Sequence, residues 1–239
     1  MAKEEFRHRI HEIYSEDRLK AIYDVWHNPK FRDNNERTEA NLDILKDLDV
    51  TYIASGTNRM TVLIDDYIHK IALDSFGVAD NWQEFNMSVD AQPYVTKTYE
   101  SNGLIAIAEY VNLMNKEEFV DSREHIAAML DVLSEDFLFC DISLSTKNIC
   151  NFGSRDNGDI VILDYGYLYP IDRKIMRCRN CGSTISWNRN YTALICDNPK
   201  CKKAHDPIEI RGRMLKKETD FTDLREKFGE GPLVLELGT

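Results

Sequence analysis

The chain has 239 residues, of which 30 are lysine or arginine and 41 are aspartate or glutamate, so its formal net charge is −11. A hydrophobic content of 43% is typical of a globular protein with one large domain or two small ones, and the acidic excess argues against nucleic-acid or anionic-membrane binding by the whole surface. No apolar run approaches the roughly 20 residues of a membrane span, and the starting sequence MAKEEF has no apolar signal core. We therefore expect a cytoplasmic protein whose six cysteines are reduced.

Apolar residues at helical spacing predict a helix over residues 4–27 and a shorter one over residues 36–48, both of them packing elements. Two strands follow within residues 52–64, joined by a turn of small residues. Such residues let backbone N–H groups approach a phosphate, although a turn with one glycine is also typical of an ordinary hairpin. The candidate phosphate-contacting residues are Ala54, Ser55, Gly56, Thr57, Asn58 and Arg59.

A lysine, Lys70, lies in the middle of the next predicted strand. A lysine that is buried there needs an anionic partner. The following predicted helix, residues 78–90 with a cap near Asp80 and Asn81, contains Glu84, which is placed to meet Lys70 across a sheet–helix interface. The alternative is that Lys70 faces water.

Two more predicted strands, residues 93–99 and 103–111, and a predicted helix, residues 116–133, lead to a polar loop over residues 137–153. The loop contains two candidate site residues, Asp141 and Asn148. We expect Asn148 to begin a short strand that ends at Phe152.

A run of four apolar residues, 160–163, predicts a buried strand that ends at Asp164-Tyr165-Gly166. Its hairpin partner is the strand that begins at Asn148. Asn148 and Asp164 then lie close enough to share a cation with a preference for oxygen ligands.

This order of motifs resembles the protein-kinase-like superfamily over residues 50–170, and more narrowly kinase-like proteins of bacteriophages with a C-terminal zinc ribbon. The resemblance implies that ATP and Mg²⁺ are cofactors and that the turn of residues 54–59 covers the phosphates. It further implies the following roles: Lys70 holds the phosphates and is oriented by Glu84, Glu109 and Val111 belong to the nucleotide-binding hinge, Asp141 accepts the proton of the substrate hydroxyl, and Asn148 and Asp164 hold Mg²⁺.

The chain departs from the family pattern at four places. Arg59 stands where the third glycine is usual, and Phe139-Cys140 replace the His-Arg before the catalytic aspartate. Asp141 and Asn148 are seven positions apart, whereas the motif has five, and no Ala-Pro-Glu follows Gly166. Three functions are therefore open: a Ser/Thr protein-kinase-like phosphotransferase, a pseudokinase-like binding or regulatory module, and a small-molecule kinase.

Four cysteines in the pattern C-x2-C…C-x4-C predict a tetrahedral four-thiolate zinc site: Cys178, Cys181, Cys196 and Cys201. Four thiolates leave no open position, so the site is expected to be structural, in a zinc ribbon with strands around Asn188-Arg189-Asn190. His205 is an alternative ligand, but the favoured interpretation is that it is a surface histidine. Cys140 and Cys150 are expected to be buried packing residues.

The basic residues concentrate in the ribbon, because residues 171–217 contain 12 basic and 4 acidic residues and the remainder has a net charge of −19. This surface either binds a partner, such as nucleic acid or an acidic protein, or docks on the acidic body of the same chain. ATP and a protein substrate or protein partner complete the expected partners, in the host cytoplasm if the protein is phage-encoded.

The expected fold class is α+β, a reduced bilobal protein-kinase-like fold with N-terminal helices and a small C-terminal four-cysteine zinc ribbon. Its predicted parts are an N-terminal helical extension (1–50), a kinase-like N lobe (51–111), a reduced kinase-like C lobe (112–170), the zinc ribbon (171–217) and a C-terminal tail (218–239).

Overall fold

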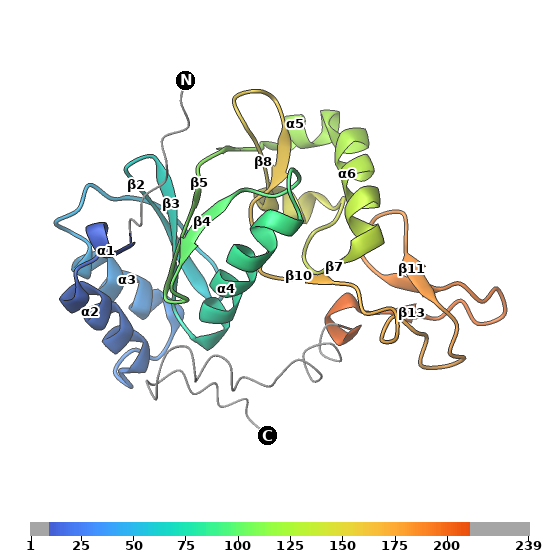
Figure 1. Ribbon diagram of the computed structural model, residues 1–239, viewed down its shortest axis with the longest axis horizontal. Coiled ribbons are helices and arrows are strands. Elements are labelled where there is room, and N and C mark those ends of the chain that lie inside the picture. The colour runs from blue at the N-terminus through green and yellow to red at the C-terminus, as the bar shows by residue number, and fades with distance from the viewer. Residues whose placement is uncertain (1–9, 211–239) are drawn as a thin grey trace. The chain divides into compact units, whose positions relative to one another are not determined.

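The computed structural model describes residues 10–210 of the chain, which form a mixed α+β structure (Figure 1). The chain divides into two compact units, with the boundary between Asn112 and Leu113. The predicted tail over residues 218–239 and the predicted helical residues 4–9 lie outside the described residues. No helix within residues 10–210 is long and apolar enough to cross a membrane.

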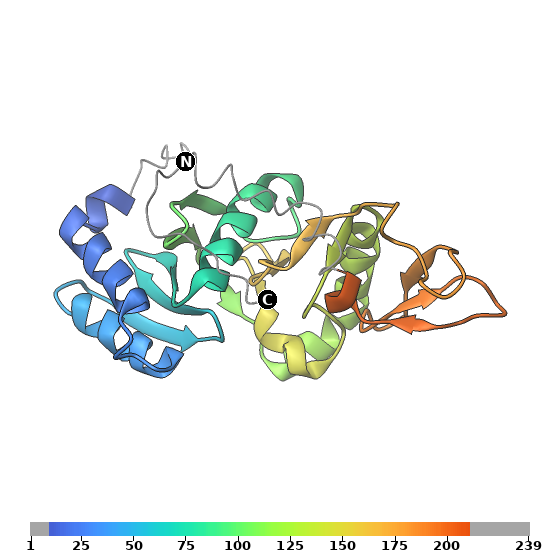
Figure 2. The ribbon, with the colours of Figure 1, turned by 90° about the horizontal axis from the view of Figure 1, so that it is seen from below.

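The first unit is an antiparallel five-stranded sheet with helices on both faces (Figure 1 and Figure 2). The strand order is β1-β2-β3-β5-β4, and helix α4 connects β3 to β4. The elements are α1 (Ile10–Ile13), α2 (Glu16–His27), α3 (Asn34–Ile44), β1 (Thr51–Ser55), β2 (Arg59–Ile64), β3 (Tyr67–Ala72), α4 (Ser75–Asp90), β4 (Thr98–Ser101) and β5 (Ile105–Glu109).

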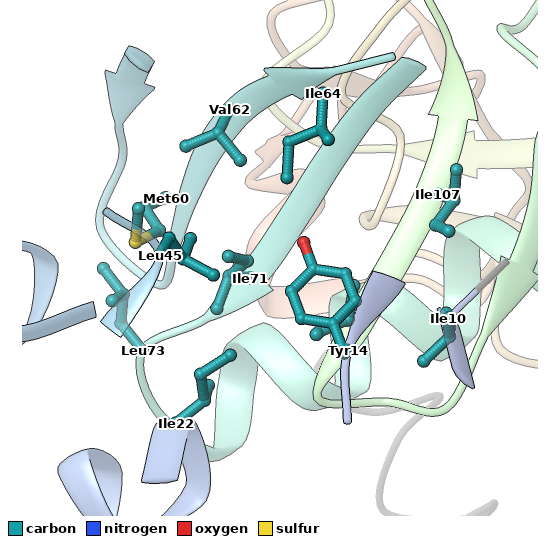
Figure 3. Close-up of a cluster of buried hydrophobic side chains, with 11 residues drawn as sticks. Ile10, Tyr14, Ile22, Leu45, Met60, Val62, Ile64, Ile71, Leu73 and Ile107 are labelled. Carbon is teal, nitrogen blue, oxygen red and sulfur yellow. The ribbon is translucent and has the colours of Figure 1, made fainter. Parts of the chain in front are cut away.

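The two faces of this sheet differ because successive side chains of a strand point to opposite sides. One face is apolar and packs against the N-terminal helices in a single core (Figure 3), which comprises Ile10, Tyr14, Ile22, Leu45, Met60, Val62, Ile64, Ile71, Leu73, Ile105 and Ile107. The other face, which is turned to α4, is mixed: Leu63 and Ile68 lie on it together with polar and small residues. The polar and small residues include Arg59, Lys70 and Ala106, with Lys70 directly opposite Ala106 in the β3–β5 register.

Three helices of this unit differ from the predictions in their boundaries, and α3, predicted over residues 36–48, begins and ends earlier, at Asn34 and Ile44. The predicted helix over residues 4–27 is interrupted at Ser15, whose side chain caps α2 by accepting a hydrogen bond from the Arg18 N–H at 3.3 Å. Helix α4 begins earlier than predicted, because Asp74 caps it by accepting from the Gly77 N–H at 2.9 Å. Asp80 and Asn81, the predicted caps, are buried within the helix.

Within residues 113–210, the second unit has the helices α5 and α6, three small sheets, a 3₁₀ helix and a helical turn at residues 207–210. The single predicted helix over residues 116–133 is two helices, because Ser122 ends the first and begins the second. The elements are β6 (Asn112–Leu113), α5 (Lys116–Asp121), α6 (Arg123–Asp136), β7 (Phe137–Phe139), η1 (Thr146–Asn151), β8 (Phe152–Ser154), β9 (Ile160–Ile162), β10 (Leu168–Pro170), β11 (Ile185–Trp187), β12 (Leu194–Cys196) and β13 (Ala204–His205).

The predicted strand from Asn148 to Phe152 is wrong for most of its length. Residues 146–151 form the 3₁₀ helix η1, and only Phe152–Ser154 pair with Ile160–Ile162. The Ser145 side chain caps η1 by accepting a hydrogen bond from the Lys147 N–H at 3.3 Å. Serine and asparagine side chains that bond to nearby backbone compete with strand pairing, which accounts for the helical turn.

The cysteine-rich segment shares a core with the strands that precede it. Buried residues of β7, β10 and the segment from Met176 to Ile210 form one cluster: Leu138, Tyr169, Met176, Cys178, Ile185, Leu194, Cys196 and Ile210. β11, β12 and β13 form the small sheet of this segment, and β13 was not among the predicted strands. The segment is therefore part of the second unit rather than an appended body.

Candidate functional site

A buried ion pair lies between the sheet of the first unit and helix α4. Lys70 on β3 is only 7% exposed, and Glu84 on α4 has no exposed surface. The Lys70 Nζ is 2.6 Å from Glu84 Oε2. The sequence prediction that these two residues meet is confirmed, and the alternative that Lys70 faces water is wrong.

Glu84 has a second cationic partner. The Arg59 Nη2 lies 2.8 Å from Glu84 Oε1, so each carboxylate oxygen binds a different cation. Arg59 also donates from Nη1 to Asn81 Oδ1 at 3.2 Å, and Asn81 donates to the carbonyl oxygen of Lys70 at 3.2 Å. The two neighbouring cations compensate the desolvation cost of burying the Glu84 carboxylate.

The turn after β1, a candidate phosphate loop, is fastened to the two helices beside it. The Ser55 hydroxyl lies 2.9 Å from that of Thr38 on α3, and Asn58 donates from Nδ2 to Asp80 on α4 at 3.2 Å. Asn34 donates to the Thr57 carbonyl. Within the turn, the Gly56 N–H donates to the Arg59 carbonyl at 2.8 Å, while Ala54, Gly56 and Thr57 are exposed.

A glycine on α4 lets the turn come this close. A Cβ atom built on Gly77 would lie 2.2 Å from the carbonyl oxygen of Asn58, a distance that side-chain atoms do not adopt. The Asn58 carbonyl accepts from the Leu73 N–H at 2.8 Å, so the backbone is held in place from a second direction. The orientation of Arg59 toward Glu84 follows from this anchored turn.

The candidate hinge follows β5. Glu109 ends the strand, and its carboxylate accepts a hydrogen bond from the Lys97 N–H at 3.1 Å. Tyr110 is 48% exposed and Val111 is 7% exposed. The hinge candidates Glu109 and Val111 thus lie at the end of the first unit.

In the second unit, the loop with Asp141 is built around a backbone carbonyl. Asp141 has a φ of 61°, in the left-handed region, and an exposed side chain. Its carbonyl oxygen accepts hydrogen bonds from Asn148 Nδ2 and Asn151 Nδ2, both at 2.6 Å. Asn148 Oδ1 in turn accepts from the Ser143 hydroxyl at 2.8 Å.

Asn151 was missed by the sequence analysis. Besides its side-chain bond to Asp141, its carbonyl accepts the Leu163 N–H at 2.9 Å, one residue before Asp164. Asn151 therefore connects the loop of Asp141 to the strand end that precedes Asp164. The only signal in the sequence is a second asparagine, three positions after Asn148 in the same polar loop.

Asp164 lies two residues beyond β9 with an exposed side chain, and the next residue, Tyr165, is fully buried. The prediction that Asn148 and Asp164 lie on paired strands is wrong, because both residues lie outside β8 and β9. Their oxygens remain candidate ligands for a hard cation such as Mg²⁺.

The four cysteines form the metal-ligand group that the spacing predicts. The Sγ atoms of Cys178, Cys181, Cys196 and Cys201 all lie within 4.8 Å of one another, which is compatible with one zinc ion. Hydrogen bonds from the Ser183 side chain and backbone lower the pKa of Cys181 to about 6, and burial raises the pKa of Cys196 to about 12. A metal ion favours the thiolate form of every ligand, so its binding releases protons.

Two predictions about single residues in this unit are wrong. His205 was expected at the surface, but it is 3% exposed and pairs with Leu194 across β12 and β13. Cys150 was expected to be buried and is exposed, since it lies on η1 rather than in a strand. Cys140 is buried, as predicted.

The basic residues of the ribbon point to water. Those within the described residues are exposed: Arg173, Lys174, Arg177, Arg179, Arg189, Lys200, Lys202 and Lys203. One ion pair of this set joins Arg179 to Glu209 at 2.5 Å. The ribbon packs on the second unit through apolar and aromatic side chains, so its packing leaves this charge at the surface.

No protein-family model matches this chain, and no curated protein matches it in sequence.

Proposed function

We propose that this chain is a protein-kinase-like phosphotransferase that binds ATP with Mg²⁺ and transfers the γ-phosphoryl group to a hydroxyl group of a protein substrate. The observation that carries the proposal is the buried ion pair of Lys70 and Glu84. In protein kinases a lysine on the third strand holds the phosphates and pairs with a glutamate on the following helix, and both residues must be in place for activity. Lys70 lies on β3, and Glu84 lies on the helix that follows it.

Phosphoryl transfer depends on positioning and counter-charge more than on covalent chemistry. In the proposed reaction, Lys70 supplies positive charge to the phosphates, and Asn148 and Asp164 supply oxygen ligands to Mg²⁺. Asp141 accepts the proton of the attacking hydroxyl. The exposure of the Asp141 and Asp164 side chains supports these roles, since both must reach groups that enter from solvent.

A second candidate is a pseudokinase-like module that binds without transfer. It is favoured by the hydrogen bonds of Asn148. The amide oxygen of its side chain accepts from the Ser143 hydroxyl, and the amide nitrogen donates to the backbone carbonyl of Asp141. A Mg²⁺ ligand in that position would share its oxygen with a hydroxyl donor. In this case the fold surface and the exposed basic residues of the ribbon bind an acidic protein or a nucleic acid.

The metal proposed for the four cysteines is a structural zinc ion. A set of four thiolates matches zinc in ligand type and number and leaves no position for a substrate. Metal analysis of the purified full chain should give one zinc per chain. A Cys178→Ser variant should lose that stoichiometry.

The function is tested by nucleotide binding and transfer with matched variants. ATP with Mg²⁺ should raise the melting temperature of the wild type by mass action, and labelled phosphate should appear on a peptide library. Lys70→Met and Asp164→Ala should remove both effects. Lys20→Met, which removes an exposed lysine on α2, should keep both effects.

Each result decides between the candidates. A melting shift without transfer to peptides or to small hydroxyl compounds supports the binding module. No shift at millimolar ATP and Mg²⁺ rejects the phosphotransferase and leaves the binding module, which acts through its surface.

A further inference from the structure

The turn between β11 and β12 of the ribbon contacts the loop that contains Asp141 and Asn148. The Leu144 N–H donates to the Asn190 carbonyl at 3.2 Å. Leu144 lies in the middle of the loop, three residues after Asp141 and four before Asn148. The ribbon thus binds the backbone of the loop directly.

An arginine at the start of helix α6 completes this contact. Arg123 donates from Nη1 to the Leu144 carbonyl at 2.7 Å and from Nη2 to Asn190 Oδ1 at 3.4 Å. Both backbone polar groups of Leu144 are therefore bonded to residues outside the loop. Since Leu144 is only 6% exposed, these groups would have little access to water in place of their partners.

The ribbon turn is itself held against α6 and β7. The Tyr191 hydroxyl donates to the carboxylate of Asp131 on α6, and the Trp187 ring stacks on Phe139 with 4.7 Å between centroids and 8° between planes. Phe139 ends β7, two residues before Asp141. In both views the ribbon strands lie beside α6 (Figure 1 and Figure 2).

One of the four cysteines, Cys196, lies in the same small sheet as the turn. Ile185 at the start of β11 pairs with Cys196 at the end of β12, and Trp187 pairs with Leu194 next to the turn. The sheet is three residues long in each of these strands, so the metal group and the turn are at its two ends. Loss of the metal removes the constraint on one end of a very short sheet.

We infer that Arg123 and the ribbon turn position the loop of Asp141 and Asn148, so that zinc binding at the four cysteines controls the order of that loop. The role of the loop in phosphoryl transfer rests on the proposed function. The link between ribbon and loop does not, because it consists of the contacts of Leu144, Arg123 and Asn190.

Hydrogen exchange of the full-length chain tests the link without reference to activity. In the zinc-loaded protein, peptides that cover residues 141–148 should be protected, and removal of zinc by a chelator should abolish that protection. Peptides that cover β3 in the first unit should not change. Unchanged protection of residues 141–148 in a protein shown to have lost its zinc would overturn the inference.

Variants of Arg123 test the same link with the metal in place. Arg123→Ala should keep one zinc per chain but speed exchange of the Leu144 amide by about tenfold or more, because a charge-assisted hydrogen bond is lost. Arg123→Lys, which keeps a cationic donor, should restore part of the protection. Arg189→Ala removes an exposed arginine from the same turn and should match the wild type.

Exchange in Arg123→Ala that equals the wild type would also overturn the inference. The proposed function can fail while the inference holds: the wild type would then show the expected exchange pattern but no stabilisation by ATP with Mg²⁺. If the proposed function and the link both hold, Arg123→Ala should reduce phosphoryl transfer but keep the melting shift with ATP and Mg²⁺, because Lys70 is unchanged. This combination separates a positioning role of Arg123 from a loss of nucleotide binding.

Discussion

Glu84→Gln should destabilise the first unit strongly, because Glu84 neutralises two buried cations. The change keeps the shape of the side chain but removes the negative charge that Arg59 and Lys70, 8% and 7% exposed, both bind. Removal of one partner of a buried ion pair costs about 3–5 kcal/mol, which lowers the melting temperature by roughly 6–20 °C in a protein of this size. Urea denaturation and calorimetry measure both quantities.

The control and the rescue follow from the same geometry. Asp24→Asn breaks the exposed pair of Lys20 and Asp24 and should cost at most about 0.5 kcal/mol. Lys70→Met in the Glu84→Gln background should recover part of the loss, since one buried cation is gone. If Glu84→Gln unfolds within about 1 kcal/mol of the wild type, the carboxylate is not the charge that holds these cations, and the reasoning is wrong.

Three further outcomes are expected. Gly77→Ala should destabilise the first unit by about 1–3 kcal/mol or more in urea denaturation, because the added Cβ would meet the Asn58 carbonyl. Gly56→Ala should not destabilise the unit, because the nearest atom to its added Cβ is 3.7 Å away. Equal effects of the two substitutions would contradict the close approach of Gly77 to Asn58. Tyr191→Phe should cost about 1 kcal/mol, because it removes the hydrogen bonds of the hydroxyl to the exposed Asp131 carboxylate and the Ala127 carbonyl, whereas Tyr52→Phe at an exposed position should be neutral by the same measurement. Chelation of zinc should expose β7 and β10 as well as the ribbon to limited proteolysis, because Leu138 and Tyr169 share a core with Cys178; cleavage confined to the ribbon would refute this.

The sequence allowed the pairing of Lys70 with Glu84 to be predicted because both signals are local. A lysine inside an alternating strand marks one sheet face, and the next helix has an acidic residue on the side turned to it. The second cation was not predicted to bind Glu84. The contact of Arg59 with Glu84 depends on the register of β2 against β3, which places Thr61 opposite Lys70, and register is not visible in a single strand.

The grouping of the four cysteines was predicted correctly, since ligand type and spacing indicate a metal site almost without other information. The loop of Asp141 was predicted less well. An asparagine followed by two apolar residues resembles the start of a strand, but Ser145, Asn148 and Asn151 bond to nearby backbone and favour a 3₁₀ turn. The contact of Leu144 with Asn190 joins residues that are 46 positions apart, so a local sequence pattern does not predict it.

The presence of two cations on Glu84 bears on how Lys70 can act. A lysine that moves toward a phosphate leaves its carboxylate partner, and a fully buried carboxylate without a counter-charge is costly. Here Arg59 stays within 2.8 Å of Glu84 through an anchored turn, so Glu84 keeps one cation while Lys70 changes partner. If the proposed function holds, Arg59, which stands at the usual position of the third glycine, would lower the cost of moving Lys70 from Glu84 to a phosphate.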